Sequence, residues 1–293
     1  MIDQFLNYMR YERRRSPETV QKYGLILKEF TAYLDSRENG LSWSLVESDT
    51  VRNWVEHLLD KGSKAVTVNL KLSALRSFYR FALRQGAVQQ NPASCVVGPK
   101  RERPLPQFVK EADMSRMIDD DEKWGDDYVG IRARTLFIIL YEAGLRRAEL
   151  IGLDDSDVDL EAGELKVTGK RNKQRVIPFG EEVRNAVIKY KAKRDETVER
   201  ENDALFVTDK GERLTGKQVY CIVRKYLSGE TSLKKRSPHV LRHSFATAML
   251  NNGAGLESVR KLLGHESLET TEIYTHTTFE QLRKAYDQAH PRG

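Results

Sequence analysis

The sequence lacks any long hydrophobic run. Its longest uninterrupted apolar stretch is LFIIL at residues 136–140, far shorter than the ~20 residues that a transmembrane helix needs. The N-terminus, MIDQFLNYMRYERRR, carries acidic and polar residues where a signal peptide would carry an apolar segment. We therefore expect a soluble, cytoplasmic protein with no membrane partner.

Cysteine is scarce, and two further signatures are missing. The two cysteines, Cys95 and Cys221, fit no metal or disulfide pattern, so we expect both to be buried, apolar side chains in a reducing compartment. There is no Gly-rich phosphate loop, and no acidic or cysteine cluster is spaced for metal ligands. The sequence therefore predicts no cofactor and no metal centre.

Positive charge is concentrated at the N-terminal end. The net charge is +6, and residues 1–103 hold 17 Lys and Arg against 11 Asp and Glu, which leaves 32 of each sign in the remainder. In that remainder, acidic residues crowd into 119–127 and 154–164, whereas SLKKRSPHVLRH at 232–243 is basic. This separation of charge favours a protein with one side for a polyanion such as nucleic acid and another for solvent.

Residues 1–90 predict a four-helix domain. A helix-start signature at residues 16–18 precedes apolar residues at the three- and four-residue spacing of a helix. Another helix is expected over 47–62, and a third has its apolar face between residues 68 and 82 and ends at Gly86. A short helix over 2–12 leads them.

Proline marks a boundary after this domain. NPASCVVGPKRERPLPQFV at 91–109 holds four prolines and shows no helical period, so we place a linker at 91–106. Its basic residues Lys100, Arg101 and Arg103 would bind DNA if the linker lies along a phosphate backbone. A solvated linker is the alternative.

Residues 107–293 predict a second, mainly helical domain with one β element. ELKVTGKRNKQRVIPF at 164–179 alternates apolar and polar residues on both sides of GKRN. This pattern predicts a β-hairpin with Lys170 at or near its tip. The expected fold class is therefore mainly α with a small β-hairpin or sheet element, in two domains.

One segment of the second domain has the composition of a phosphate site. In SPHVLRHSFATAMLNNG at 237–253, Ser237 and Pro238 open a helix, and His239 and Arg242 share one face of its first turns. A helix N-terminus with an imidazole and a guanidinium suits a phosphate oxyanion.

A second segment places arginines at a helix break. LYEAGLRRAELIGL at 140–153 interrupts a hydrophobic helix at Gly144 and restarts it, which leaves Arg146 and Arg147 at the break. An arginine in such a place is more often a surface charge than part of a site, so Arg146 needs support from elsewhere in the chain.

That support comes from four motifs in order. GLRRAEL, GKRNKQRVIPF, HVLRHSFAT and LLGHESLETTEIYTH resemble the tyrosine site-specific recombinases of the phage integrase family, and most closely the Xer type. The first two motifs are weak alone and the last two are strong. The four-helix domain is also similar to the family's core-binding (SAM-like) domain, so the resemblance covers nearly the whole chain. It implies a two-domain DNA clamp whose DNA breaking-rejoining catalytic domain spans 107–293 and ends in a tail, 277–293.

The resemblance implies roles for particular residues. Tyr274 would be the nucleophile that attacks a DNA phosphodiester, and the resulting 3′-phosphotyrosyl ester would let the strand rejoin without a cofactor. Arg146 and Arg242 would clamp the non-bridging oxygens, and His265 would donate a further hydrogen bond. His239 would accept the tyrosine proton as general base.

Two lysines compete for the remaining role. Lys170 would reach the minor groove from the hairpin and protonate the leaving 5′-oxygen, and Lys173 on the same turn is its rival and otherwise a DNA contact. Glu149 and His243 are candidate supports that orient the arginines, with purely structural roles as the alternative. Arg147 is expected to be a surface or backbone-phosphate contact.

The implied function is recombination at a duplex DNA site. Two duplexes would exchange strands through a Holliday junction in a homotetramer, or in a heterotetramer with a related recombinase, close to the nucleoid. Xer-like chromosome-dimer resolution is our first interpretation. An integrase or transposase of a mobile element is the alternative, although we expect no additional arm-binding domain before residue 1. A type IB topoisomerase would not need the tail after Tyr274, and a catalytically inactive regulator would not keep all six catalytic positions filled.

The tail has a helical pattern of its own. Phe279, Leu282 and Tyr286 fall at three- and four-residue spacing and predict a short helix. So short a helix must dock to persist. It could dock on its own domain, whereas the resemblance favours docking on a neighbouring protomer.

Overall fold

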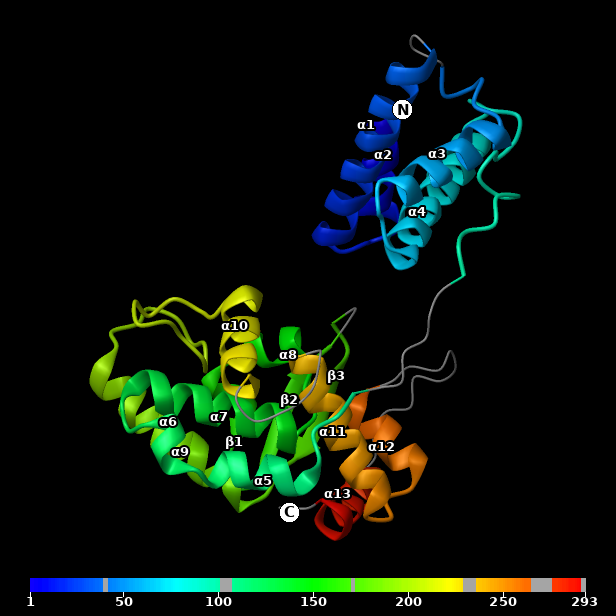
Figure 1. The fold of residues 1–293 in the computed structure, drawn as a ribbon. Helices are drawn as coiled ribbons and strands as arrows, with labels where there is room; N and C mark the ends of the chain where they lie inside the picture. The colour runs from blue at the N-terminus through cyan, green and yellow to red at the C-terminus, as the bar shows by residue number, and fades with distance from the viewer. Residues whose placement is uncertain (39–41, 101–106, 170–171, 229–235, 265–275, 291–293) are drawn as a thin grey trace. The chain divides into compact units, whose positions relative to one another are not determined.

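The computed structural model of the 293-residue chain describes residues 1–38, 42–100, 107–169, 172–228, 236–264 and 276–290. For residues 37–38 and 276–282 it describes the backbone alone. The chain divides into two compact units, Met1–Pro104 and Leu105–Gly293. In Figure 1 the helices of the first unit are blue to cyan, and those of the second run from green to red.

The first unit is built of helices around an aromatic core. Its elements are α1 (Ile2–Asn7), the π-helical η1 (Tyr8–Glu12), α2 (Pro17–Glu38), α3 (Ser48–Asp60) and α4 (Ala65–Arg84). Phe30 packs edge-on against Trp54 with ring centroids 4.8 Å apart, and Phe5 packs edge-on against Phe78 at 5.5 Å. Such rings supply much of the buried area in a small core. The helices lie where the sequence predicted them, with shifted ends.

The proline-rich segment after α4 packs on that helix as far as it is described. Arg76 and Asn69 of α4 donate hydrogen bonds to three backbone carbonyls between residues 93 and 99. These bonds satisfy backbone groups that have no partner in a helix or sheet. This part of the expected linker therefore belongs to the first unit.

The second unit is centred on α7 (Tyr128–Glu142). Between Ile131 and Tyr141 every side chain of this helix except that of Arg134 is buried, as expected for a helix that is apolar on most sides. It packs against α9 (Glu181–Thr197) and α11 (Pro238–Asn251). The unit also contains α5 (Glu111–Asp119), α6 (Asp121–Trp124), α8 (Arg147–Ile151), α10 (Gly216–Leu227), α12 (Leu256–Leu263) and α13 (His276–Ala289).

A small antiparallel sheet contains the predicted hairpin. β2 (Glu164–Thr168) pairs with β3 (Gln174–Pro178), with Leu165 opposite Ile177 and Val167 opposite Arg175. A third strand, β1 (Val158–Asp159), follows the 3₁₀ turn η2 (Asp155–Asp157) and pairs with β2. The sequence did not predict β1, because two residues are too few to show alternation. The expected fold class, mainly α with a small sheet in two domains, is confirmed.

Helix α13 packs within its own chain. Tyr286 is fully buried, and its ring stacks on that of His290 with centroids 4.7 Å apart. Nδ1 of His290 lies 3.1 Å from Oε2 of Glu142 at the end of α7. This end of the tail therefore docks on its own domain. The side chains of Phe279 and Leu282 lie outside the described residues.

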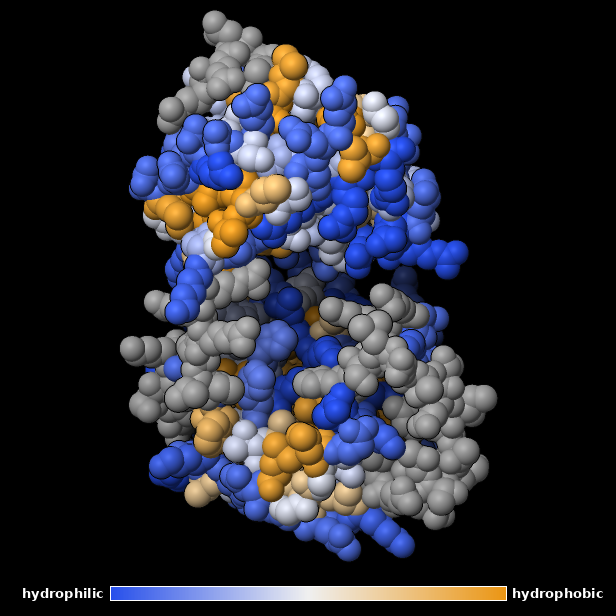
Figure 2. All heavy atoms as spheres, turned by 90° about the vertical axis from the view of Figure 1, so that its right-hand side faces the viewer, coloured by the Kyte–Doolittle hydropathy of each residue, from blue (hydrophilic) through white to orange (hydrophobic). Residues whose placement is uncertain are grey.

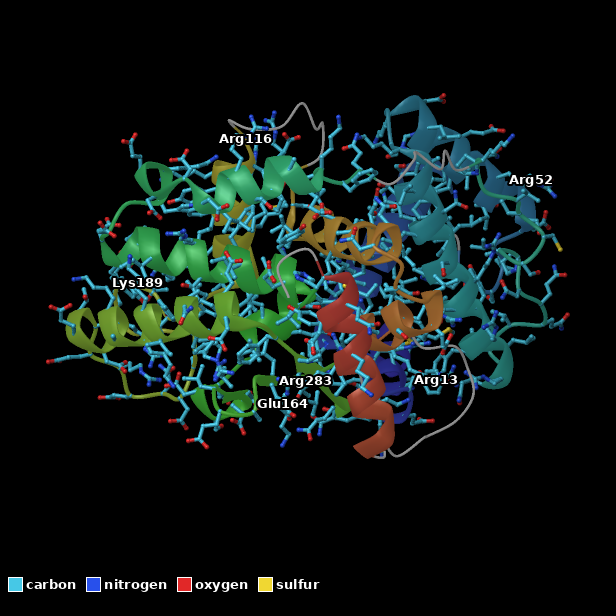
Figure 3. All side chains as sticks on the ribbon, turned by 90° about the horizontal axis from the view of Figure 1, so that it is seen from below. Arg13, Arg52, Arg116, Glu164, Lys189 and Arg283 are labelled. Carbon is cyan, nitrogen blue, oxygen red and sulfur yellow. The ribbon has the colours of Figure 1, made fainter. Side chains whose placement is uncertain are left out.

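A second contact fastens α13 beside the sheet. Arg283 of α13 donates a hydrogen bond of 2.8 Å to the carbonyl of Ala162, in the turn between β1 and β2. Figure 3 labels Arg283 next to Glu164, the first residue of β2. The tail is thus held at the sheet as well as at α7.

The prediction that both cysteines are buried was wrong, since Cys95 and Cys221 are exposed. On α10, Val219 and Val223 mark the buried face, and Cys221 lies midway between them on the opposite side. Cys95 lies in a turn beside the buried Val96.

Hydrophilic side chains cover most of the described surface in Figure 2, with smaller apolar groups between them. Among the described helices, none has the length and apolar character for a membrane span.

Candidate active site

The break between α7 and α8 positions the first candidate arginine. After α7 ends at Glu142, Gly144 turns the chain with a φ of +58°, where side chains other than glycine are disfavoured. A Cβ atom on Gly144 would also lie 2.4 Å from Cδ1 of Phe245. Arg146 then forms the N-cap of α8, and its backbone N–H donates to Oε2 of Glu149 at 2.8 Å. The glycine therefore sets the position of Arg146.

Helix α11 carries the next two candidates. Ser237 and Pro238 occupy its N-cap and first positions, as predicted, although the Ser237 side chain makes no capping bond. His239 is exposed, whereas Arg242 is only 6% exposed. Nη1 of Arg242 donates to the carbonyl of Gly144 at 2.7 Å. This bond ties α11 to the break between α7 and α8.

One buried carboxylate holds these arginines together. Glu149 is 4% exposed, and Nη1 of Arg146 donates to its Oε1 at 2.7 Å. Arg175, from β3, donates to both oxygens, at 2.8 and 2.9 Å. Nη1 of Arg242 lies 3.8 Å from Oε2. We call these four residues the arginine cluster, and its three guanidinium groups outnumber its one carboxylate.

Each arginine of the cluster also donates a hydrogen bond to the end of α12. The acceptors are successive carbonyl oxygens: Leu262 accepts from Arg175 at 3.0 Å, Leu263 from Arg242, and Gly264 from Arg146 at 2.9 Å. The last carbonyls of a helix have no partner within it and form the negative end of its dipole, so guanidinium groups satisfy both needs. The residue after Gly264 in the sequence is His265.

The charges of the cluster are out of balance. Burial raises the pKa of Glu149, but hydrogen bonds and charge from Arg175 and Arg146 outweigh it and bring the pKa down to about 2. Burial and the positive charge of Arg146 lower the pKa of Arg242 to about 10. A guanidinium in these surroundings gains from an additional anion. The cluster is therefore suited to bind a phosphate.

The surroundings of His239 keep its ring neutral. Partial desolvation lowers the pKa of His239, and the charges of His243, Arg242 and the two arginines at the start of α8 lower it further. At neutral pH the ring is therefore uncharged and can accept a proton, as a general base must.

Comparison with known proteins assigns the chain to a family. Residues 2–86 match the N-terminal SAM-like domain of phage integrases, and residues 107–281 match the phage integrase family. The chain belongs to the phage integrase family. A curated tyrosine recombinase XerC of Chlorobaculum parvum is 38% identical over 315 residues, covering 99% of this chain and 94% of the relative. A XerC of Shigella flexneri serotype 5b is 39% identical over 295 residues, covering 100% and 96%.

Solved structures agree in fold with this phage integrase family member. XerH site-specific recombinase bound to palindromic difH substrate, in a post-cleavage complex, aligns with a TM-score of 0.73 at 24% identity, covering 97% of this chain and 84% of that chain. The Tn1549 transposon integrase in complex with transposon right end DNA aligns with a TM-score of 0.70 at 20% identity, covering 98% of each. The shared fold extends over nearly the whole chain.

The structure describes part of the predicted site. Three candidate catalytic residues are described: Arg146, His239 and Arg242. The two arginines belong to one cluster, and His239 lies near enough for their charges to lower its pKa. Outside the described residues lie Lys170, His265, Tyr274, Arg101 and Arg103. Two candidate DNA contacts are described and exposed: Lys100 and Lys173. The roles of all these residues stay predictions.

The expected supporting residues differ in what they contact. Glu149 orients Arg146 through two hydrogen bonds, as predicted. His243 is exposed. It lies near enough to His239 to lower the pKa of the His239 ring electrostatically. Arg147 donates a hydrogen bond of 3.1 Å to the carbonyl of Gly216 at the start of α10. Arg147 is exposed, as predicted for a surface contact, and this bond links α8 to α10.

Arg175 was not among the site residues predicted from the sequence. In β3 this arginine and Ile177 face inward, whereas Val176 between them is exposed. An arginine on the buried face of a strand needs a charged or hydrogen-bonding partner. That inverted alternation was the available signal.

Within the described ranges, no group of three or more His, Cys, Asp or Glu side chains is arranged to hold a metal ion.

Proposed function

We propose that the protein is a site-specific DNA recombinase that cuts and rejoins duplex DNA through a 3′-phosphotyrosyl intermediate on Tyr274. The observation that carries this proposal is the arginine cluster, in which one carboxylate faces three guanidinium groups. A DNA phosphodiester would supply the missing negative charge. Membership of the phage integrase family and the XerC relatives support the same reaction.

In the proposed cleavage step, the phenolic oxygen of Tyr274 attacks phosphorus and the bond from phosphorus to the 5′-oxygen breaks. His239 accepts the tyrosine proton, and its lowered pKa keeps it ready to do so. Lys170 gives a proton to the leaving 5′-oxygen, and His265 donates a hydrogen bond to a non-bridging oxygen. Attack by the freed 5′-hydroxyl reverses the step and rejoins a strand, because the ester retains the energy of the broken bond.

Arg146 and Arg242 stabilise the charge on the non-bridging oxygens. Each guanidinium has five N–H donors and uses only some of them on Glu149 or on backbone carbonyls. Those bonds fix the plane of the guanidinium before DNA binds. The remaining donors are thus preorganised, which is where electrostatic catalysis gains most.

We further propose that the protein acts as a homo- or heterotetramer on its DNA site and resolves chromosome dimers, in accord with its XerC relatives. Mapping the DNA that the protein binds in its native cell tests this role and supplies the substrate for other tests. A single chromosomal site near the replication terminus is the expected result. Binding at the ends of a mobile element would instead favour an integrase or transposase.

A suicide substrate tests the chemistry. A nick next to the cleavage point lets a short fragment diffuse away, so the covalent protein–DNA adduct accumulates. The wild-type protein should form this adduct with or without EDTA. Tyr274→Phe should bind the DNA as well as wild type and form none, because only the attacking oxygen is gone. An adduct from Tyr274→Phe, or a strict need for a divalent metal ion, would refute the proposed mechanism.

A further inference from the structure

We propose that Arg175 is a positioning residue for strand cleavage, which joins the hairpin carrying Lys170 to Glu149 and to the end of α12. This proposal rests on the proposed recombinase function and assigns Arg175 no contact with DNA. Through Glu149 it sets the phosphate-binding arginines, and through α12 it sets the start of the segment that continues to His265 and Tyr274.

The geometry of Arg175 is that of a rigid connector. Its Nη1 and Nη2 donate to the two oxygens of Glu149 at 2.8 and 2.9 Å, and its Nε donates to the carbonyl of Leu262 at 3.0 Å. The side chain is 8% exposed, so water competes little for these bonds. A planar guanidinium can make all three bonds at fixed angles, which an ammonium group on a flexible stem cannot do.

The first consequence concerns Arg146. Arg146 and Arg175 donate to the same oxygen, Oε1 of Glu149, at 2.7 and 2.8 Å. Arg175 therefore offsets the charge of Glu149 and holds its carboxylate in one orientation. Without Arg175, the carboxylate would keep its two bonds from Arg146, but its charge would no longer be shared with a third guanidinium, and it would compete with the phosphate for Arg146 and Arg242.

The second consequence concerns the end of α12. The backbone at Gly264 approaches Arg175 so closely that a Cβ atom would lie 3.1 Å from Nη1 of Arg175. Together with the bonds from Arg242 to Leu263 and from Arg146 to Gly264, Arg175 fixes the place from which the chain continues to His265. Since a misplacement of about 1 Å in a reacting group can cost roughly 100-fold in rate, this anchor bears on catalysis without touching the substrate.

The same domain offers a matched control. Arg194 on α9 is fully buried, donates to both oxygens of Asp155 at 2.9 and 3.0 Å, and donates to the carbonyl of Leu205 at 2.8 Å. Its bonds resemble those of Arg175, with one further bond from Nε to Asp195, but it has no contact with the arginine cluster among its described partners. Loss of Arg194 therefore reports the structural cost of removing a buried, carboxylate-bound arginine.

The experiment compares Arg175→Met, Arg175→Lys and Arg194→Met with wild type in the full-length protein. We would measure thermal unfolding midpoints, affinity for one DNA site, and the single-turnover rate of adduct formation on the nicked substrate. The rates would be measured at a temperature below the unfolding midpoints of all variants. Arg175→Met should cleave roughly 100-fold slower with little change in affinity. Arg175→Lys keeps the charge, so it should fold even if Arg175→Met does not, and should still cleave slowly. Arg194→Met should lose stability and keep its rate.

Three results would overturn the proposal. A rate loss in Arg194→Met equal to that in Arg175→Met would make the role of Arg175 structural. A wild-type cleavage rate in Arg175→Lys would show that a positive charge suffices without the planar, multiply bonded guanidinium group. Recovery of the rate in the double variant Arg175→Met with Glu149→Gln would show that Arg175 only neutralises Glu149 and does not position α12. Failure of the recombinase proposal is distinct, since wild type itself would then form no adduct, and both proposals would fall.

Discussion

Two buried arginine networks in the second unit share a geometry and differ in charge balance. Arg175 and Arg194 each grip a carboxylate with both Nη groups and a backbone carbonyl with a third bond. In the Arg194 network a second carboxylate, Asp195, also accepts a hydrogen bond from Arg194, at 2.8 Å, and Arg200 and Lys191 pair with Asp155 as well, so two carboxylates face three cations. In the arginine cluster Glu149 alone faces three guanidinium groups.

The pKa values of the arginines express this difference. Burial lowers the pKa of Arg194, but hydrogen bonds to Asp155 and Asp195 outweigh it and raise the pKa above the ordinary value. Burial and Arg146 lower the pKa of Arg242 to about 10. The Arg194 network has two carboxylates for three cations, whereas the arginine cluster has one carboxylate for three, so the cluster has the greater need of a further anion. Groups whose pKa values are perturbed by burial and nearby charge are concentrated at functional sites.

The test with the largest expected effect removes one arginine from each network and compares the consequences for cleavage rate and for stability. Arg242→Ala should slow cleavage by about 10²–10³-fold, because a preorganised donor to the transition state is removed. Arg194→Met should instead lower the free energy of unfolding by on the order of 1–3 kcal/mol, because the hydrogen bonds of a buried arginine are lost while Arg200 and Lys191 still pair with Asp155. Single-turnover cleavage and urea unfolding measure the two effects. Equal rate losses in both variants would abolish the distinction between the networks.

The next test distinguishes a cation that protonates the leaving 5′-oxygen from one that binds the non-bridging oxygens. If Lys170 protonates the leaving 5′-oxygen, a substrate with sulfur at the 5′-bridging position should rescue Lys170→Ala, because a thiolate leaves without a proton. Arg242→Ala should not be rescued, since its role is on the non-bridging oxygens. Adduct formation on the oxygen and sulfur substrates measures the rescue. Rescue of Lys173→Ala in place of Lys170→Ala would transfer the role to Lys173.

A third buried pair, His290 with Glu142, extends the comparison to the tail. It has one carboxylate for one imidazole and fastens α13 within its own chain. If the first part of α13 docks on a neighbouring protomer in the tetramer, Phe279→Asp with Leu282→Asp should weaken synapsis of two DNA sites and leave binding to one site intact. Gel shifts and cross-linking on one-site and two-site DNA measure this. Gln288→Asp, on the exposed face of α13, is the control.

Normal synapsis by the Phe279→Asp, Leu282→Asp protein would show that the whole tail docks on its own domain. The buried position of Tyr286 already shows this for the end of the helix. The result would therefore decide whether both ends of α13 dock on the same chain or whether its first part docks on a neighbouring protomer.

The smallest expected effect is a change in the titration of His239. Desolvation and nearby positive charge hold its pKa below 6.5. Arg242→Ala removes one of those charges, so the midpoint should move up towards 6.5, whereas Arg194→Met should leave it where it is. NMR titration of the imidazole in the DNA-free protein measures both. A midpoint that Arg242→Ala does not raise would contradict the proposed closeness of the two side chains.

Local spacing predicted some of these features and misjudged others. The helices and the hairpin follow from the period of their apolar residues, and Ser237 with Pro238 marked the start of α11. Composition alone misplaced Cys95 and Cys221, because a small apolar side chain is as compatible with a turn or an outer helix face as with the core. Arg146 stood out only through the order of the motifs.

By itself the sequence determined the elements and the family, since periods and ordered motifs are properties of the chain. Only the tertiary structure decided which charges meet. Glu149 and Arg175 are 26 positions apart, and Arg175 is 87 positions from the carbonyl of Leu262 that it binds. Every residue has such a carbonyl, so no pattern of side chains marks Leu262, Leu263 and Gly264 as acceptors. They become acceptors because α12 ends there and leaves its last carbonyls unpaired beside three arginines.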